Sequence, residues 1–239
     1  MRVASWNLGY WQHQKYHNEA WEYLRDVIRP DIALLQETVI PTLAEDESVI
    51  FSQIRKPWGT AVYAKGIRLD KLPTTVNPPR VAAATLDLTV DGAPIYVVSI
   101  HAPVIDGRVF PQLSNIFEEV QRLVETHPSI VGGDLNTARL AEKVWPGYGH
   151  GPFFEKLERG PFTDCHRQFE PTEIQTFFRR GSLHPFQDDH LFTTTSLAKR
   201  LTSCRAINDA ITQRVSDHIP LVATFELRDP NTFDGATSA

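Results

Sequence analysis

The chain has 239 residues and a formal net charge of −5, from 24 basic and 29 acidic side chains. This length fits one large α/β or β-sandwich domain, or two small domains, and a hydrophobic content of 41% is enough for a sizeable core. The negative charge argues against a protein that holds polyanions through a bulk positive field. It does not exclude an enzyme that meets nucleic acid through a local patch and metal ions.

No apolar stretch reaches the roughly 18 residues that a membrane helix needs, and the N-terminal sequence MRVASWNLGY has no signal-peptide core. We therefore expect a cytoplasmic protein without a membrane partner. In a reducing compartment Cys165 and Cys204 are expected to be free thiols, either in the core or incidental.

The first third of the chain shows two strand patterns around one helix pattern. RVASWNLG, residues 2–9, reads as a strand that meets a loop at Asn7. Residues 17–29 are predicted to form a helix that Pro30 closes. DIALLQE then reads as a short buried strand ending at Glu37, whereas residues 38–58 show no clear pattern. The apolar stripe of the helix consists of Ala20, Trp21, Leu24, Val27 and Ile28.

Further along the chain, strand patterns dominate. GTAVYAK and VAAATLDLTV read as strands, and Asp91-Gly92 is a hairpin signal that joins the second to APIYVVSIHAP. Residues 111–126 have helical spacing, SIVGGDLN is a strand, residues 140–188 are loop-rich, and HLFTT and LVATFEL are the last strands. We expect one compact α/β domain with layered sheets over residues 1–228 and a disordered tail at 229–239.

The segment GGDLN raises the question of function. Residues two apart in a strand face the same side, so Asp134 and Asn136 are expected to project together, while Gly132 and Gly133 permit close approach of other groups. A capped turn is the alternative interpretation, because Asp and Asn favour turns through local hydrogen bonds. This motif alone does not decide between them.

Similar polar side chains recur at other strand boundaries. Burying such a group costs free energy unless it is paired, so a shared cleft with a metal ion would account for all of them together. The residues concerned are Asn7, Glu37, His101, Asp134, Asn136, Asp189, His190, Asp217 and His218.

The motifs SWN, LLQE, SIHAP, GGDLN, DDHLF and SDHIPL follow one another in this order between residues 5 and 221. Together they resemble the endonuclease/exonuclease/phosphatase superfamily, the group of DNase I and the exonuclease III type AP endonucleases. The resemblance spans residues 3–227. It implies an α/β (α+β) four-layer αββα sandwich, in which two mixed β-sheets pack face to face with helices outside, and metal-dependent phosphoester hydrolysis.

The resemblance also implies a Mg²⁺ site, with Mn²⁺ as a substitute. Mg²⁺ prefers oxygen ligands and needs only one or two carboxylates beside the substrate phosphate. Glu37 is then the primary ligand, Asn7 offers a neutral oxygen, and Asp217 adds a contact that is direct or through water.

The remaining roles follow the same resemblance. Asp134 would orient and deprotonate the attacking water, and Asn136 would hold the phosphate. His218 would contact phosphate oxygens or transfer protons, with Asp189 fixing its tautomer and raising its pKa. His101 would bind the phosphate from its other side or act as general acid.

Two departures from the family pattern stand out. Where DNase-like members carry a glutamate that pairs with the histidine at position 101, the register here gives Arg80, which either binds phosphate or is a solvated residue at a strand start. Gln187 stands where members often have arginine. Asp188 receives no role, since Asp189 fits the register better, and His190 is expected to be structural.

The substrate is set by loops, and aromatic residues interleaved with arginines in residues 8–18, 104–111 and 140–187 suit bases beside phosphates. An equally supported alternative is that these aromatic side chains pack beneath the long loops. A nuclease is the first prediction; a phosphatase or phosphodiesterase for a small soluble phosphoester is the second. A non-catalytic binding module is disfavoured, because every expected metal and water-orienting position is filled.

Overall fold

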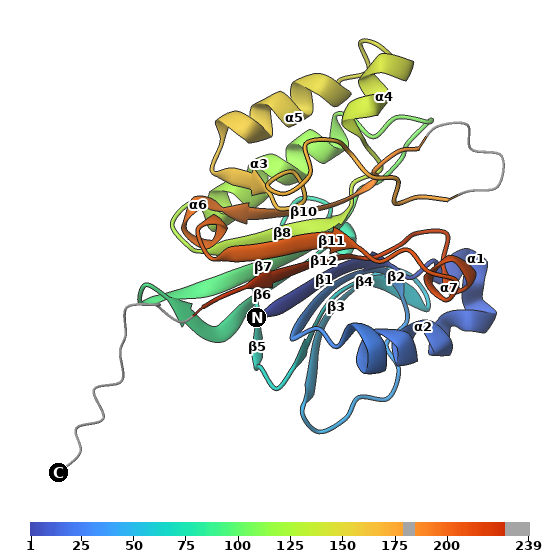
Figure 1. The fold of residues 1–239 in the computed structure, drawn as a ribbon, viewed down its shortest axis with the longest axis vertical. Helices are drawn as coiled ribbons and strands as arrows, with labels where there is room; N and C mark the ends of the chain where they lie inside the picture. The colour runs from blue at the N-terminus through green and yellow to red at the C-terminus, as the bar shows by residue number, and fades with distance from the viewer. Residues whose placement is uncertain (179–184, 228–239) are drawn as a thin grey trace.

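The computed structural model describes residues 1–178 and 185–227. Two mixed β-sheets, each of six strands, pack face to face, and helices cover their outer faces (Figure 1). This confirms the predicted αββα sandwich. Among the described residues, no helix has the length and apolar character to cross a membrane. The predicted tail, and Arg179 and Arg180 of the predicted aromatic and arginine loop, lie outside the described residues.

Each sheet is built around a central parallel pair flanked by antiparallel strands. In the first sheet β1 pairs in parallel with β2, and in the second β7 pairs in parallel with β8. The order in the first sheet is β11 (Leu201–Ala206), β12 (Leu221–Phe225), β1 (Arg2–Asn7), β2 (Ile32–Thr38), β4 (Trp58–Lys65) and β3 (Glu47–Arg55). The order in the second is β5 (Leu69–Lys71), β6 (Val81–Val90), β7 (Ala93–His101), β8 (Ser129–Asp134), β10 (Asp189–Thr194) and β9 (Phe162–Asp164).

The helices are short apart from α3 and α5, which lie together on the outer face of the second sheet (Figure 1). They are α1 (Tyr10–His13), α2 (His17–Tyr23), α3 (Gln112–Val124), α4 (Arg139–Val144), α5 (His150–Arg159), α6 (Thr195–Ala198) and α7 (Thr212–Val215). Further turns of helix are η1 (Gln14–Tyr16), η2 (Leu24–Ile28) and η3 (Pro78–Arg80).

The core is divided between the layers. Ile32, Leu34 and Val62 of the first sheet meet Ala82 and Ala84 of the second in the space between the sheets. A second cluster joins the outer face of the second sheet to α3 and α5, and a third joins the first sheet to α2. The inner strands are therefore buried on both faces, which explains their nearly continuous apolar runs.

The helix predicted over residues 17–29 forms, but its buried stripe differs from the prediction. Its second half, η2, is a π-helix, whose wider turn rotates the later side chains relative to an α-helix. As a result Val27 is 57% exposed, while Tyr23 is buried in its place. Arg29 then adopts a left-handed conformation with φ 51° and ends the helix before Pro30.

Several elements were missed by the sequence prediction. Residues 38–58 contain β3, and the region expected to be loop-rich contains α4, α5 and β9. β3 is an edge strand with partly exposed side chains, so its sequence carries no clean alternation. α5 begins directly after Gly149, whose φ of 97° is a left-handed conformation that favours glycine, and this glycine-rich approach obscures the helix start.

Candidate active site

The polar side chains at the strand ends meet because of the topology. In the register Asn7 lies beside Gln36, the residue before Glu37, and His101 lies beside Asp134, so each central parallel pair ends in polar groups at one edge. Antiparallel β10 starts at the same edge, where Asp189 pairs with Asp134. His218 precedes β12 and reaches this edge from the last strand.

Asp134 is the centre of the cluster. Its side chain is buried, and its Oδ2 atom accepts a hydrogen bond of 2.8 Å from the Asn7 amide. The same oxygen lies 3.7 Å from His101 Nε2 and 3.9 Å from His218 Nε2. Donors from both sheets thus surround one carboxylate oxygen.

His218 and Asp189 form a buried pair, with Nδ1 of the imidazole 2.7 Å from Oδ2 of the carboxylate. Burial by itself would lower the pKa of His218, but the charges of Asp189 and Asp134 and the hydrogen bond to Asp189 raise it well above its ordinary value. The two carboxylates therefore favour the protonated imidazole of His218, whose Nε2 lies 3.9 Å from Asp134 Oδ2. The other oxygen of Asp189 is buried and has no hydrogen-bond partner among the described residues.

His101 has the opposite character. Burial lowers its pKa to about 4, with Asp134 opposing this change and Arg80 adding to it, so the ring is neutral at pH 7. Arg80 Nη1 lies 3.5 Å from His101 Nδ1. Because a guanidinium only donates hydrogen bonds, Nδ1 accepts and the proton sits on Nε2, which faces Glu37 and Asp134. Arg80 thus lies beside His101, where the register prediction put it.

Glu37 lies where a cation would be stabilised. Burial raises its pKa to about 7, and the neighbouring charges of Asp134 and Asp217 add to the rise. Its backbone is left-handed with φ 44°, a conformation that costs free energy in a residue with a side chain. Crowded carboxylate and amide oxygens in a partly buried site fit a hard divalent cation such as Mg²⁺.

Two neighbouring sets of residues, with no member in common, could hold that ion. Ligand atoms of Asp134, Asp189 and His218 lie within 4.8 Å of one another, but a protonated imidazole offers no lone pair to a metal. The set predicted from the sequence is Glu37 with Asn7 and Asp217. Asn7 Oδ1 accepts a 2.9 Å hydrogen bond from the Gly9 backbone, which leaves this oxygen one further lone pair.

The geometry at Asn136 corrects the strand argument made from the sequence. β8 ends at Asp134, and Asn136 lies beyond it in a left-handed conformation with φ 50°. Its backbone N–H donates to Asp134 Oδ1 at 3.0 Å, and its side-chain amide donates to the Ala102 carbonyl at 3.0 Å. A capped turn, rather than strand alternation, therefore places Asp134 and Asn136 at one site.

A cleft of about 500 Å³ opens beside this cluster. Of the predicted site residues, Glu37, Arg80, His101 and Asn136 line it. Arg55 and Trp58 also line it and were missed, because they lie in the segment without a sequence pattern; the run RKPW is the only local signal. A second cavity of about 350 Å³ shares Asn136 and Val104 with the cleft and includes Arg108, Phe110, Trp145 and Tyr148 from the predicted loops.

The DDHLF motif and the residue before it contain both structural residues and a residue that interacts with the cluster. His190 is buried and its Nε2 contacts the Thr137 carbonyl, and Gln187 accepts the Ile174 backbone N–H, so both have structural contacts. Asp188 was given no role from the sequence. Its carboxyl group nevertheless interacts electrostatically with the cluster, because burial and the charge of Asp134 raise its pKa to about 8.

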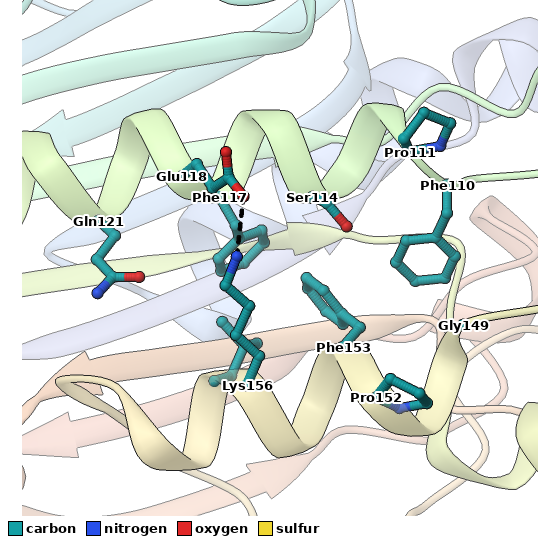
Figure 2. A pocket seen from close by; sticks show the side chains of 11 residues that line it. Phe110, Pro111, Ser114, Phe117, Glu118, Gln121, Gly149, Pro152, Phe153 and Lys156 are labelled. Atoms are coloured by element: carbon teal, nitrogen blue, oxygen red, sulfur yellow. Dashed lines mark hydrogen bonds and ion pairs between the residues drawn. The ribbon is translucent and has the colours of Figure 1, made fainter.

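A third cavity, of about 290 Å³, lies between α3 and α5 on the outside of the second sheet (Figure 2). Phe110, Phe117 and Phe153 contribute its aromatic rings, and a 2.9 Å ion pair between Lys156 and Glu118 crosses it. Among the residues described, it shares no lining residue with the cleft of the catalytic cluster. It does share Phe110 with the second cavity, so it borders that cavity but not the catalytic cluster.

Comparisons with known proteins agree with the fold. Among solved structures, the 3′ phosphatase NExo from Neisseria, bound to a product DNA hairpin, is 20% identical with a TM-score of 0.74 and covers 95% of this chain and 99% of its own. The AP endonuclease LMAP from Leishmania major is 20% identical with a TM-score of 0.75, covering 93% and 86%. An AP endonuclease from Archaeoglobus fulgidus is 22% identical with a TM-score of 0.70, covering 95% and 99%.

These likenesses concern the fold, and no curated protein sequence matches the chain. The family assignment comes from the sequence profile of the "Endonuclease/Exonuclease/phosphatase family", which matches residues 4–218. That match includes the strand ends that supply Asn7, Glu37, His101, Asp134 and His218. The chain therefore belongs to the endonuclease/exonuclease/phosphatase family and is a metal-dependent phosphoester hydrolase.

Proposed function

We propose that this protein is a Mg²⁺-dependent nuclease that hydrolyses phosphodiester bonds of nucleic acid. The observation that carries the proposal is the state of the cluster around Asp134. One carboxylate is held by the Asn7 amide between a protonated His218 and a neutral His101, with Glu37 alongside. Such an arrangement offers a base, charged and neutral hydrogen-bond donors and a cation site around one point.

The metal would be held by Glu37, with Asn7 and Asp217 as further oxygen donors. Bound there, Mg²⁺ or Mn²⁺ would neutralise phosphate charge and stabilise the leaving oxygen. Asn7 would also orient the Asp134 carboxylate, because its side-chain amide donates a hydrogen bond to that group.

Asp134 is the base that orients the attacking water and takes its proton. His218 donates its Nε2–H to a phosphate oxygen, and Asp189 keeps it protonated and correctly turned through the 2.7 Å contact. His101, being neutral, contributes Nε2–H as a hydrogen-bond donor to the phosphate rather than as a general acid at pH 7. Asn136 and Arg80 line the same cleft and complete the phosphate site.

Nucleic acid is the favoured substrate because aromatic and arginine side chains line the cleft and the adjoining cavity. The NExo structure with a DNA hairpin supports this choice as a structural relative. A small phosphoester is the second candidate, which the net charge of −5 favours, because the chain as a whole does not attract polyanions.

The test is Mg²⁺-dependent cleavage of a labelled DNA panel of plain duplex, single strand and duplex with one abasic site. Asp134→Asn should nearly abolish cleavage while the protein stays folded. Asp87→Asn, an exposed carboxylate on β6, is the matched control and should keep full activity. Cleavage that persists in Asp134→Asn would contradict the mechanism. If wild type cuts none of the panel, the nuclease proposal fails and a phosphate-release screen with small phosphoesters should show activity.

A further inference from the structure

We propose that the cleft beside the catalytic cluster binds one unpaired nucleotide next to the scissile phosphate. Its base would stack on Trp58 or Trp11 and its phosphate would contact Arg55. The enzyme would therefore act on single strands or frayed ends in preference to continuous duplex. This inference rests on the proposed nuclease function and specifies the form of its substrate.

The topology brings the hairpin between β3 and β4 to the catalytic edge. Arg55 and Trp58 pair with each other across the turn that joins these strands. Next along β4, Gly59 pairs with Thr38, the residue that follows Glu37 on β2. Trp58 therefore lies beside the end of the strand that carries Glu37, and its ring centre is 6.0 Å from that of His101.

The second indole of the cleft belongs to α1. Trp11 is 60% exposed, although it is among the largest apolar side chains of the protein. It is held near the site, since α1 follows Gly9, whose backbone N–H donates to Asn7 Oδ1. Two tryptophans on the wall of one cleft that also contains Glu37 and Asn136 are suited to stack on a base.

The arginines of the cleft are not held in close ion pairs, although the charges of Glu37 and Asp134 act on Arg80. In the part of the chain that the structure describes, neither Arg55 nor Arg80 forms an ion pair, whereas Arg25 pairs with Glu47 at 2.6 Å. Unpaired guanidinium groups attract phosphate, which they bind in a bidentate manner. Arg80 faces the phosphate site beside His101, so Arg55, at the turn, is placed for the next phosphate.

The net charge of the chain favours contact with a single nucleotide over contact with a long stretch of duplex. A protein that contacts about 6–10 phosphates of duplex DNA does so through many Lys and Arg side chains, which form a broad cationic surface. This chain has more acidic than basic residues, with a net charge of −5. Stacking on an indole also requires a base that is free of its partner strand. A single unpaired nucleotide meets both conditions.

The experiment compares kcat/KM for three substrates: a short single strand, the same strand in a blunt duplex with blocked ends, and bis(p-nitrophenyl) phosphate, a small ester that has no base to stack and no second phosphate. Trp11→Ala and Arg55→Gln are the test variants, because both side chains are exposed and their loss should leave the fold intact. Phe169→Ala and Arg68→Gln are matched controls at exposed positions outside the cleft.

Wild type should prefer the single strand to the duplex. The ratio of kcat/KM for the single strand to that for the small ester should fall about tenfold in each test variant, in line with stacking and phosphate contacts, and should not change in the controls. An unchanged ratio in both test variants, or equal cutting of the blocked duplex, would overturn the subsite alone. Failure of wild type to cut any nucleic acid while it hydrolyses the small ester would overturn the nuclease proposal and the subsite with it.

Discussion

Replacement of Glu37 by glutamine should make the metal-free protein more stable while it abolishes metal-dependent hydrolysis. Glu37 is held in a place where its charge is unfavourable, because burial and the charges of Asp134 and Asp217 raise its pKa from 4.5 to about 7. A group whose pKa is raised by folding is destabilising when ionised, so its cost appears as pH rises from the unfolded pKa through the folded one.

The magnitude follows from this change in pKa. The rise from 4.5 to about 7, at about 1.4 kcal/mol per pH unit, sets the cost of the Glu37 charge at about 3 kcal/mol above pH 8. Since 18% of the side chain is exposed and solvent screens part of the repulsion, we expect a measured gain of about 2–3 kcal/mol in Glu37→Gln. The gain should decline as the pH falls from the folded pKa toward the unfolded one and become small near pH 4.5, because the carboxyl group is then increasingly protonated in the unfolded as well as the folded protein.

The assay is urea unfolding of wild type and Glu37→Gln in EDTA at pH 8 and again at pH 4.5, followed by fluorescence. Glu22→Gln, an exposed glutamate on α2, serves as the control and should shift neither curve. Addition of Mg²⁺ at pH 8 should stabilise wild type but not Glu37→Gln. If Glu37→Gln were no more stable than wild type at pH 8 in EDTA, the explanation of Glu37 as a strained cation ligand would be refuted.

Two further predictions concern the pair formed by His218 and Asp189 and the two glycines Gly133 and Gly66. Asp189→Asn should remove the charge that keeps His218 protonated, so the pKa of His218, followed by NMR, should fall and activity should fall by about 10²-fold or more; an unchanged titration would show that Asp189 is not its partner. Gly133→Ala should prevent folding or cost more than about 4 kcal/mol in thermal unfolding, because a Cβ there would lie 1.9 Å from the Ile100 carbonyl oxygen. Gly66→Ala, where nothing lies within 4 Å, should cost only about 1 kcal/mol; equal losses for the two variants would contradict the packing argument.

The sequence predicted the central strands and the candidate site because the signals there are local and strong. Apolar runs that lead to Asn7, Glu37, His101 and Asp134 show both the strand and, to within one residue at Glu37, the place where it stops, since β2 ends at Thr38. The hairpin residues Arg55 and Trp58 could not be found in this way, since their closeness to Glu37 depends on the pairing of β4 with β2.

Other differences arise from local backbone geometry that residue patterns do not encode. Val27 fits the predicted apolar stripe, yet the π-helix turns it toward solvent. Asn136 reaches the site through a left-handed turn rather than by strand alternation. Likewise, the protonation states of His101 and His218 depend on which charges surround each ring, and those neighbours come from distant parts of the chain.

The distribution of the cluster along the chain has a consequence for synthesis in the cell. Asn7 lies on the first strand, while Ser216, whose hydroxyl donates to the Asn7 carbonyl at 2.8 Å, comes 209 residues later, beside His218. When the ribosome has made only the first two hundred residues, the nascent chain contains Glu37 and Asp134 but not His218. The growing chain should therefore be inert toward phosphoesters, and a protein that hydrolyses nucleic acid would gain its activity only when its last strand has been made and has docked.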